Sequence, residues 1–102
     1  MRAIHVVFLD KPRPALILTR SALVGRMSRV TIAPITSRIR GLSTELAVGA
    51  RNGLPAESVV SLDNVETVPL DRLGERIGFL LPDQEDQLAQ AISVAFDLEP
   101  TV

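Results

Sequence analysis

Prolines and glycines interrupt this chain at short intervals, and they limit how long any regular element can be. Seven prolines and six glycines are spread over 102 residues. Proline breaks a helix interior and cannot donate to a strand ladder, and glycine favours turns. This pattern excludes a helical bundle and favours short strands joined by turns. No apolar run approaches the roughly 18 residues of a membrane-spanning helix, so the sequence predicts no membrane segment.

Short runs of branched and apolar residues lie between these turns and predict the strands. We expect strands over residues 4–9, 15–19, 29–35, 43–48, 58–62, 65–68 and 76–81. Pro34 falls within the third run, and it belongs at a strand end, an edge or a bulge because it lacks an N–H. Residues 70–73 are expected to form one helical turn.

The last twenty residues change character and predict the only long helix. It is expected to begin at residues 82–86, where Asp83 can cap it and Asp86 can reach back to the cap. Four apolar residues at helical spacing should pack on the sheet: Leu88, Ile92, Ala95 and Phe96. Pro100 should end the helix. The sequence therefore predicts a mainly β single domain over residues 1–102, a small, strongly bent antiparallel barrel with a C-terminal helix.

The composition excludes several kinds of chemistry. The chain has no cysteine and one histidine, which rules out a disulfide framework, a cysteine nucleophile and a zinc site built from cysteine and histidine. Counting alone does not exclude a Mg²⁺ ion held by carboxylates. Residues 1–10 do not resemble a signal peptide, and small exported proteins often carry disulfides, so a cytoplasmic location is favoured.

The two halves of the chain have opposite charge. Residues 1–51 carry nine basic and two acidic side chains, a formal charge of +7, whereas residues 52–102 carry two basic and ten acidic side chains, a formal charge of −8. One interpretation is a face that binds an anion such as nucleic acid. The alternative is that the two halves neutralise each other across the fold.

Two segments of the basic half could hold an anion. Arg13 precedes Pro14, which keeps the arginine extended just before an apolar strand. Further along, two hydroxyls and two arginines follow one another, and the arginines share a side if the backbone stays extended. The members of this second segment are Thr36, Ser37, Arg38 and Arg40. The alternative for both segments is a polar turn with solvated charges.

The acidic half contributes a third candidate, and His5 a fourth. Asp63 and Glu66 are paired carboxylates that could serve acid–base chemistry or hold a metal, and the amide of Asn64 could recognise a base edge. An ordinary Asp-Asn turn explains the same residues. His5 lies in an apolar run and is more simply a structural residue. It is also the only side chain whose unperturbed pKa lies near neutrality.

Five segments together resemble the MazF/PemK/Kid-type toxins. The stretch 13–19 (RPALILT) is similar to the family's Arg-Pro and apolar strand, and 33–37 (APITS) to its Pro-x-Thr strand end. Residues 40–46 resemble the strand that follows, 61–68 (SLDNVETV) the segment with an acidic residue and a polar neighbour, and 73–80 the strand before the terminal helix. The match covers nearly the whole chain, in order.

The resemblance implies a toxin of a type II toxin–antitoxin system, with a MazF/CcdB-type, SH3-like barrel. Such toxins are ribosome-independent, sequence-selective endoribonucleases that inhibit translation and growth. They act as homodimers, bind RNA across the dimer, and are neutralised by the disordered tail of a MazE-like antitoxin in the same groove. They need no metal or other cofactor, and the 2′-hydroxyl of the RNA attacks to leave a cyclic phosphate. By position, the catalytic residues are Arg13 and Thr36, and the polar residue that contacts a base is Asn64; Asp63 lies beside it.

Two departures from the family pattern leave the general base open. The chain begins Arg2-Ala3-Ile4-His5 instead of the usual Gly-Glu-Ile/Val-Trp, and the first loop is cut to about residues 10–12. Either Asp10 or His5 could serve as acid or base. The rival functions are a non-enzymatic barrel toxin that inhibits DNA gyrase, which would not need Arg13 and Thr36, and a plain RNA-binding barrel, for which three phenylalanines are a poor stacking surface. Whether the target is mRNA, rRNA or tRNA stays open.

Overall fold

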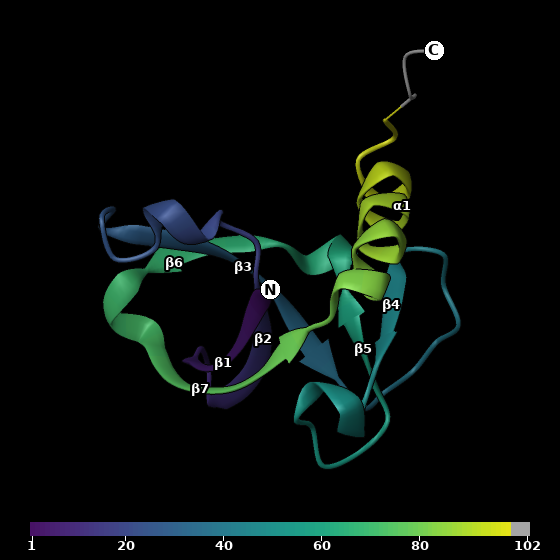
Figure 1. Cartoon of the computed structure of the whole chain (residues 1–102), viewed down its shortest axis with the longest axis horizontal. Coiled ribbons are helices and arrows are strands. Elements are labelled where there is room, and N and C mark those ends of the chain that lie inside the picture. Colours follow the sequence, from purple (N-terminus) through teal and green to yellow (C-terminus); the bar gives the residue numbers. More distant parts are fainter. Residues whose placement is uncertain (99–102) are drawn as a thin grey trace.

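The computed structural model describes residues 1–98, and within them the chain forms seven strands, five short 3₁₀ turns and one α-helix (Figure 1). The strands are β1 (Arg2–Phe8), β2 (Pro12–Ile17), β3 (Arg29–Thr36), β4 (Glu45–Val48), β5 (Ser58–Ser61), β6 (Glu66–Pro69) and β7 (Leu73–Leu80). The 3₁₀ turns are η1 (Ser21–Leu23), η2 (Ala50–Asn52), η3 (Leu62–Asn64), η4 (Leu70–Arg72) and η5 (Pro82–Gln84), and the helix is α1 (Glu85–Ala95). Each predicted strand is confirmed, with ends moved by up to three residues.

The strands form one strongly curled antiparallel sheet. Its order is β4-β5-β3-β2-β1-β7, and β6 pairs with β3 outside this path. Strand β3 changes partner along its length: residues 29–32 pair with β6, and residues 35–36 pair with β5. Pro34 lies between these two stretches, so its missing N–H removes no ladder bond to either strand. The predicted bent barrel with a terminal helix is thereby confirmed.

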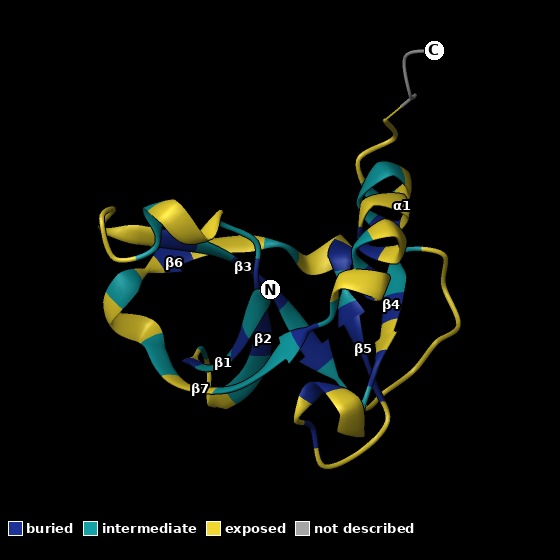
Figure 2. Ribbon diagram, viewed as in Figure 1, coloured by how far each residue is buried: buried dark blue, intermediate teal, exposed yellow. Residues whose placement is uncertain are grey.

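Two apolar clusters hold the sheet in this shape. One lies between the sheet and α1 and includes Leu16, Leu46 and Leu88. The other fills the inside of the curl formed by β1, β2, β3 and β6 and includes Val7, Ile32 and Val68. Figure 2 shows that the buried residues lie mainly on the strands, whereas the connecting loops and the outer side of α1 are exposed. The curl therefore has a core on either side of β3.

Helix α1 packs beside β4 and β5 at one end of the molecule, as predicted, but two details of that prediction are wrong (Figure 1). Asp83 caps nothing and instead pairs with Arg51, and Gln84 accepts the Leu81 N–H over 2.9 Å. Phe96 is 55% exposed because the helix ends at Ala95 and the chain then turns. Pro100 lies outside the described residues. No helix in residues 1–98 is long and apolar enough to cross a membrane.

A buried polar contact joins the turn after β4 to the start of α1. The Asn52 side chain is 1% exposed and donates to Phe79 O and to Gln84 Oε1, over 2.9 and 2.7 Å. Gly78 on β7 lies so close that an added Cβ would sit 1.8 Å from Asn52 O. This contact ties the turn after β4 to the end of β7 and to the turn that precedes α1.

Candidate functional site

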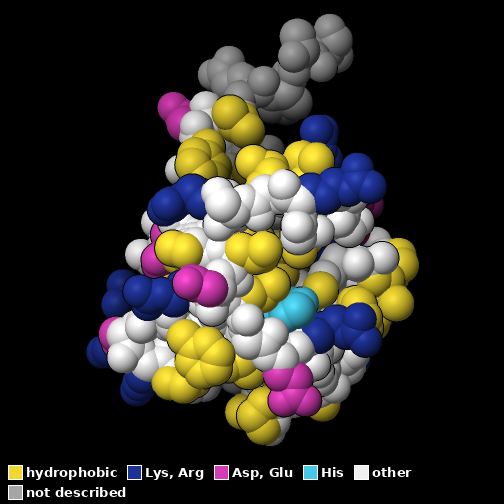
Figure 3. Space-filling view, turned by 90° about the vertical axis from the view of Figure 1, so that its left-hand side faces the viewer, with side chains coloured by type: hydrophobic (Ala, Val, Ile, Leu, Met, Phe, Trp, Pro, Cys, Tyr) yellow, Lys and Arg dark blue, Asp and Glu magenta, His cyan; other side chains and the backbone are white. Residues whose placement is uncertain are grey.

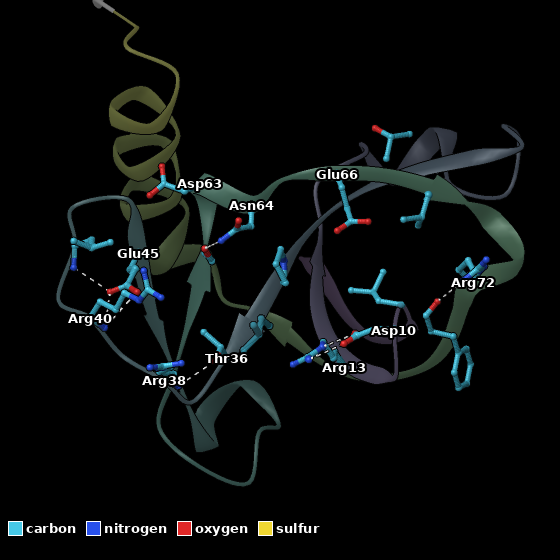
Figure 4. A pocket seen from close by; sticks show the side chains of 18 of the residues that line it. Asp10, Arg13, Thr36, Arg38, Arg40, Glu45, Asp63, Asn64, Glu66 and Arg72 are labelled. Carbon is cyan, nitrogen blue, oxygen red and sulfur yellow. Dashed lines mark hydrogen bonds and ion pairs between the residues drawn. The ribbon is translucent and has the colours of Figure 1, made fainter.

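An open groove of about 940 Å³ runs along the concave side of the sheet (Figure 4). Its walls come from the turn between β1 and β2, the end of β3, the loop before β4, the segment from β5 to β6, and η4. Eight candidate residues from the sequence line it: Asp10, Arg13, Thr36, Arg38, Arg40, Asp63, Asn64 and Glu66. The fold thus brings together side chains that are up to 56 positions apart in the chain.

The pair Asp10–Arg13 lies in the middle part of this groove (Figure 4). Arg13 Nε donates to Asp10 Oδ1 over 2.9 Å, and Nη2 donates to Oδ2 over 3.1 Å. These hydrogen bonds lower the pKa of Asp10 to about 2 and raise the pKa of Arg13 above its ordinary value. The Arg13 side chain is 38% exposed, so it stays accessible to a ligand while its orientation is held.

Thr36 is the last residue of β3, the strand beside β2, and it lines the same groove as Arg13. The pairing of β2 with β3 ends at Ala15–Pro34, two residues from Arg13 and from Thr36. Thr36 Oγ1 accepts the Arg38 N–H over 3.1 Å, which leaves the threonine O–H able to donate to a ligand.

Arg38 and Arg40 lie at one end of the groove on a loop that Glu45 holds in place. The Glu45 carboxylate accepts the backbone N–H of Arg40 over 3.2 Å and that of Leu42 over 3.0 Å. Gly41 in this loop has a φ of +74°. The loop is irregular, so the extended backbone that would put the two arginines on one side is not formed. Both arginine side chains are nevertheless exposed and line the groove.

Asp63 and Asn64 belong to η3, which forms a different wall of the groove from the loop that carries Arg38 and Arg40. Asp63 Oδ2 accepts the Thr44 hydroxyl over 2.6 Å, and Asn64 Nδ2 donates to Ser61 Oγ over 2.7 Å. Both residues are exposed. The amide oxygen of Asn64 therefore points to no protein donor among the described residues and can accept from a ligand.

The structure does not bring His5 and Ser37 into the groove. His5 lines a separate cavity of about 330 Å³, together with Arg2 and Glu85, and its Nδ1 lies 2.9 Å from Gly74 O. Ser37 is exposed but does not line the groove. Among residues 1–98, no group of three or more acidic, histidine or cysteine side chains is arranged to hold a metal ion.

The charge split of the sequence is only partly expressed in the groove. Of the nine basic residues in the first half, Arg13, Arg38 and Arg40 line it, and four carboxylates line it as well: Asp10, Glu45, Asp63 and Glu66. Other basic residues pair across the fold, since Arg2 lies 3.4 Å from Glu85 and Arg51 lies 2.7 Å from Asp83. On the face in Figure 3, basic, acidic and hydrophobic side chains alternate. The two ion pairs agree with neutralisation across the fold, and the binding of an anion by the groove stays a prediction.

Sequence reasoning missed one arginine of the groove. Arg72, from η4, lies at the end opposite Arg38 and Arg40 (Figure 4). Its Nη1 donates to Phe8 O over 3.1 Å, which ties η4 to the end of β1 across 64 residues of sequence. No local motif surrounds Arg72, so only the pairing of β1 with β7 could have indicated its position.

A comparison of the whole chain with known protein families gives a matching family model. Residues 9–96 match the model of the PemK-like, MazF-like toxins of type II toxin–antitoxin systems. The chain belongs to this family. The predicted resemblance is confirmed.

Individual MazF-like relatives support the same assignment. Endoribonuclease MazF3 of Mycobacterium tuberculosis is 54% identical over 99 residues, which cover 97% of this chain and 96% of the relative. The solved structure of Mycobacterium tuberculosis toxin MazF-mt6 superposes with a TM-score of 0.94 at 54% identity, covering 96% of this chain and 99% of that one. A mycobacterial endoribonuclease solved in complex with its cognate antitoxin superposes with a TM-score of 0.84 at 25% identity. The match covers 97% of this chain and 95% of that chain.

Proposed function

We propose that this MazF-like chain is a sequence-selective endoribonuclease, the toxin of a type II toxin–antitoxin pair, which cleaves single-stranded RNA in the cytoplasm and so inhibits translation and growth. The observation that carries the proposal is that Arg13 and Thr36, on the adjacent strands β2 and β3, line one groove with Arg38 and Arg40. The endoribonuclease names of its relatives support the same reaction.

The reaction is a transfer of phosphorus from one ribose oxygen to another. The 2′-hydroxyl oxygen forms a bond to the scissile phosphorus as its proton leaves, and the bond from phosphorus to the 5′-oxygen of the next nucleotide breaks. That oxygen takes up a proton, and a 2′,3′-cyclic phosphate remains. Arg13 contacts the non-bridging oxygens and stabilises the charge that develops on them, and the Thr36 hydroxyl donates to one of the same oxygens.

Asp10 could orient Arg13 or accept a proton in this reaction. The carboxylate of Asp10 holds Arg13 in its orientation. Its pKa of about 2 makes it a weak proton acceptor near neutral pH, so orientation is its main role. Since His5 lines a different cavity, we assign it no proton transfer.

The remaining groove residues position the RNA. Arg38 and Arg40 contact the phosphates on one side of the scissile bond, which fixes register without selecting sequence. Asn64, with Asp63 beside it, contacts a base edge through its free amide oxygen. Ser37, which lies outside the groove, is omitted from these contacts.

Two protein partners complete the proposal. A MazE-like antitoxin covers the groove with an acidic, partly disordered segment, and the toxin acts as a homodimer. The antitoxin complex of a mycobacterial relative supports the first partner. The gyrase-inhibiting alternative is not favoured, because such a toxin has no use for Arg13 and Thr36 in one groove and the curated relatives are named as endoribonucleases.

The test is to map the ends that the purified toxin produces in a defined RNA mixture. Cuts at a recurring short sequence with cyclic phosphate ends, lost in Arg13→Ala, are expected. Growth arrest with intact RNA and poisoned DNA gyrase would favour the alternative instead.

A further inference from the structure

Glu66 is the one groove carboxylate without a protein partner among the described residues. Asp10 is bound by Arg13, Glu45 by two backbone N–H groups, and Asp63 by the Thr44 hydroxyl. No hydrogen bond or ion pair engages the Glu66 side chain, which is exposed and lines the groove. A carboxylate with no partner therefore remains in a groove whose other three carboxylates are each engaged by the protein.

The strand register places this carboxylate on the inward side of β6. Glu66 is paired with Ile32 of β3, and Val68, two residues later, is paired with Val30. Ile32, Val30 and Val68 all belong to the core inside the curl. The residue between them, Thr67, is paired with Thr31, and the two hydroxyl oxygens lie 2.7 Å apart; Thr67 borders the groove as well. Glu66 thus shares its side of β6 with the core residue Val68, while its own side chain is exposed to the groove.

Glu66 and Arg13, a member of the proposed catalytic pair, lie on different walls of the groove. Figure 4 shows Glu66 on the β6 wall, projecting into the groove, with Asp10 and Arg13 on the opposite wall. A phosphate bound at Arg13 leaves its nucleoside free to extend toward the β6 wall. Asn64, two residues before Glu66, lies on this same wall.

A negative charge in a groove that binds RNA weakens contact with phosphates unless it gains a hydrogen bond in return. An ionised carboxylate accepts hydrogen bonds and donates none. The base atoms that suit it are exocyclic amino groups, such as N4 of cytosine, N6 of adenine or N2 of guanine. Uracil has no exocyclic amino group. Its one donor on this edge is the ring N3–H, which lies between two carbonyl oxygens that repel a carboxylate, so uracil suits Glu66 less well than a base with an amino group.

We propose that Glu66 is a specificity-determining residue, which accepts a hydrogen bond from the exocyclic amino group of one RNA base and excludes uracil at that position. This inference rests on the proposed function, because it assumes that the groove holds RNA. It adds a recognition element on the β6 wall to the contact expected from Asn64.

The experiment measures base preference in binding, separately from cleavage. Short RNAs made uncleavable by 2′-fluoro substitution carry each of the four bases at every position in turn, and their affinities are measured for the wild type, Glu66→Gln and Glu66→Ala. Glu75→Gln is the matched control, since Glu75 is also an exposed strand carboxylate but lies outside the groove. Thermal unfolding checks that all variants are folded.

The wild type and Glu75→Gln should disfavour uracil at one position by roughly 10- to 100-fold, the scale of a good base contact. Glu66→Ala should lose this discrimination. Glu66→Gln should admit uracil, because its amide can donate to a carbonyl oxygen. An unchanged profile in Glu66→Ala overturns the proposal, and so does an equal gain of affinity for all four bases, which would mark Glu66 as a merely repulsive charge.

The proposed function fails in a different way. If the wild type cuts none of the matching unmodified RNAs, the endoribonuclease proposal is wrong, whatever the binding profile shows. If the wild type cuts RNA but shows no preference against uracil at any position, only the inference about Glu66 is wrong.

Discussion

Asp10 and Arg13 are joined by two hydrogen bonds of 2.9 and 3.1 Å across the turn between β1 and β2. The guanidinium is thereby held at the edge of β2 with its remaining N–H groups free. The short first loop of this chain thus supplies an acidic partner for the arginine from within three residues. This relationship leads to our first prediction.

Asp10→Asn should lower the rate of RNA cleavage by about tenfold. The amide keeps the size of the side chain but loses one acceptor and the charge that orient Arg13, and hydrogen bonds to charged groups contribute more than neutral ones, although exposure reduces the effect. Single-turnover cleavage of one RNA is the measurement. A loss as large as that of Arg13→Ala would instead place Asp10 among the groups that transfer protons.

The pH dependence of the same pair has a defined sign. The pKa of Asp10 is lowered to about 2, so the ion pair is complete above the ordinary carboxyl pKa and is lost only as the pH falls toward 2. Between pH 5 and 8 the pair does not titrate. Wild-type cleavage should therefore show no inflection from Asp10 in this range, and the ratio of wild-type to Asp10→Asn rates should stay constant across it.

Arg13→Ala and Thr36→Ala should each lower cleavage by about 100- to 1000-fold, as expected for the loss of one donor to the transition state. Both side chains are part of the groove wall and not of the apolar clusters, so the unfolding temperature should change little. Arg29→Ala, which removes an exposed arginine outside the groove, is the control. Near-normal cleavage by either groove variant would remove that residue from the catalytic assignment.

Cleavage should continue at full rate in EDTA. The prediction follows from the composition, since the chain has no cysteine and one histidine, and from a mechanism in which the RNA supplies its own nucleophile. The measurement compares initial rates in EDTA and in added Mg²⁺ at matched ionic strength. Activity that EDTA abolishes and Mg²⁺ restores would make Asp63 and Glu66 candidate ligands and change the reaction class.

Much of the fold could be predicted from short-range pattern, because strands and turns are set locally. Apolar runs bounded by proline, glycine and polar turns located all seven strands. The helix start was wrong in detail because Asp83 has a long-range partner, Arg51, 32 residues away. The predicted apolar stripe of the helix includes one residue too many, Phe96, because no local sequence signal shows that the helix ends at Ala95.

Site residues could be predicted where a sequence motif lies on strands that pair with each other. They could not be predicted where contacts between distant segments determine which side chains reach the groove. Arg13 and Thr36 lie on adjacent paired strands, so their motifs brought them together. His5 lies beside irregularities in the pairing of β1 with β7, where simple alternation does not tell which side a residue faces. Arg72 reaches the groove only through η4 and its bond to Phe8 O, and no sequence signal reports that contact.

Asn52→Ala should destabilise the fold by about 2 kcal/mol, because it removes the side-chain donor to the Phe79 carbonyl and one of the two donors to the buried Gln84 Oε1. Urea denaturation monitored by circular dichroism measures the loss. Asn64→Ala removes an exposed amide of the same type and should leave the midpoint unchanged. Because Asn52 lies outside the groove, the folded fraction of Asn52→Ala should still cleave RNA, and an unchanged midpoint would contradict the assigned role.

The double variant Arg38→Glu with Arg40→Glu should weaken RNA and antitoxin binding together. Both ligands are expected on one surface, and opposite charges across it speed association and make it sensitive to salt. Glu45 holds this loop through backbone N–H groups, so the loop should keep its shape when the two side chains change. Affinity is measured for an uncleavable RNA and for the acidic antitoxin segment, each at two salt concentrations.

Arg26→Glu with Arg29→Glu is the matched control, since it makes the same change in charge with exposed arginines outside the groove. It should leave both affinities within a few-fold of the wild type. Loss of RNA binding with unchanged antitoxin binding in the Arg38/Arg40 variant would place the two ligands on different faces. If the basic half served only to neutralise the acidic half, both double variants would lose stability alike, and neither would lose one ligand selectively.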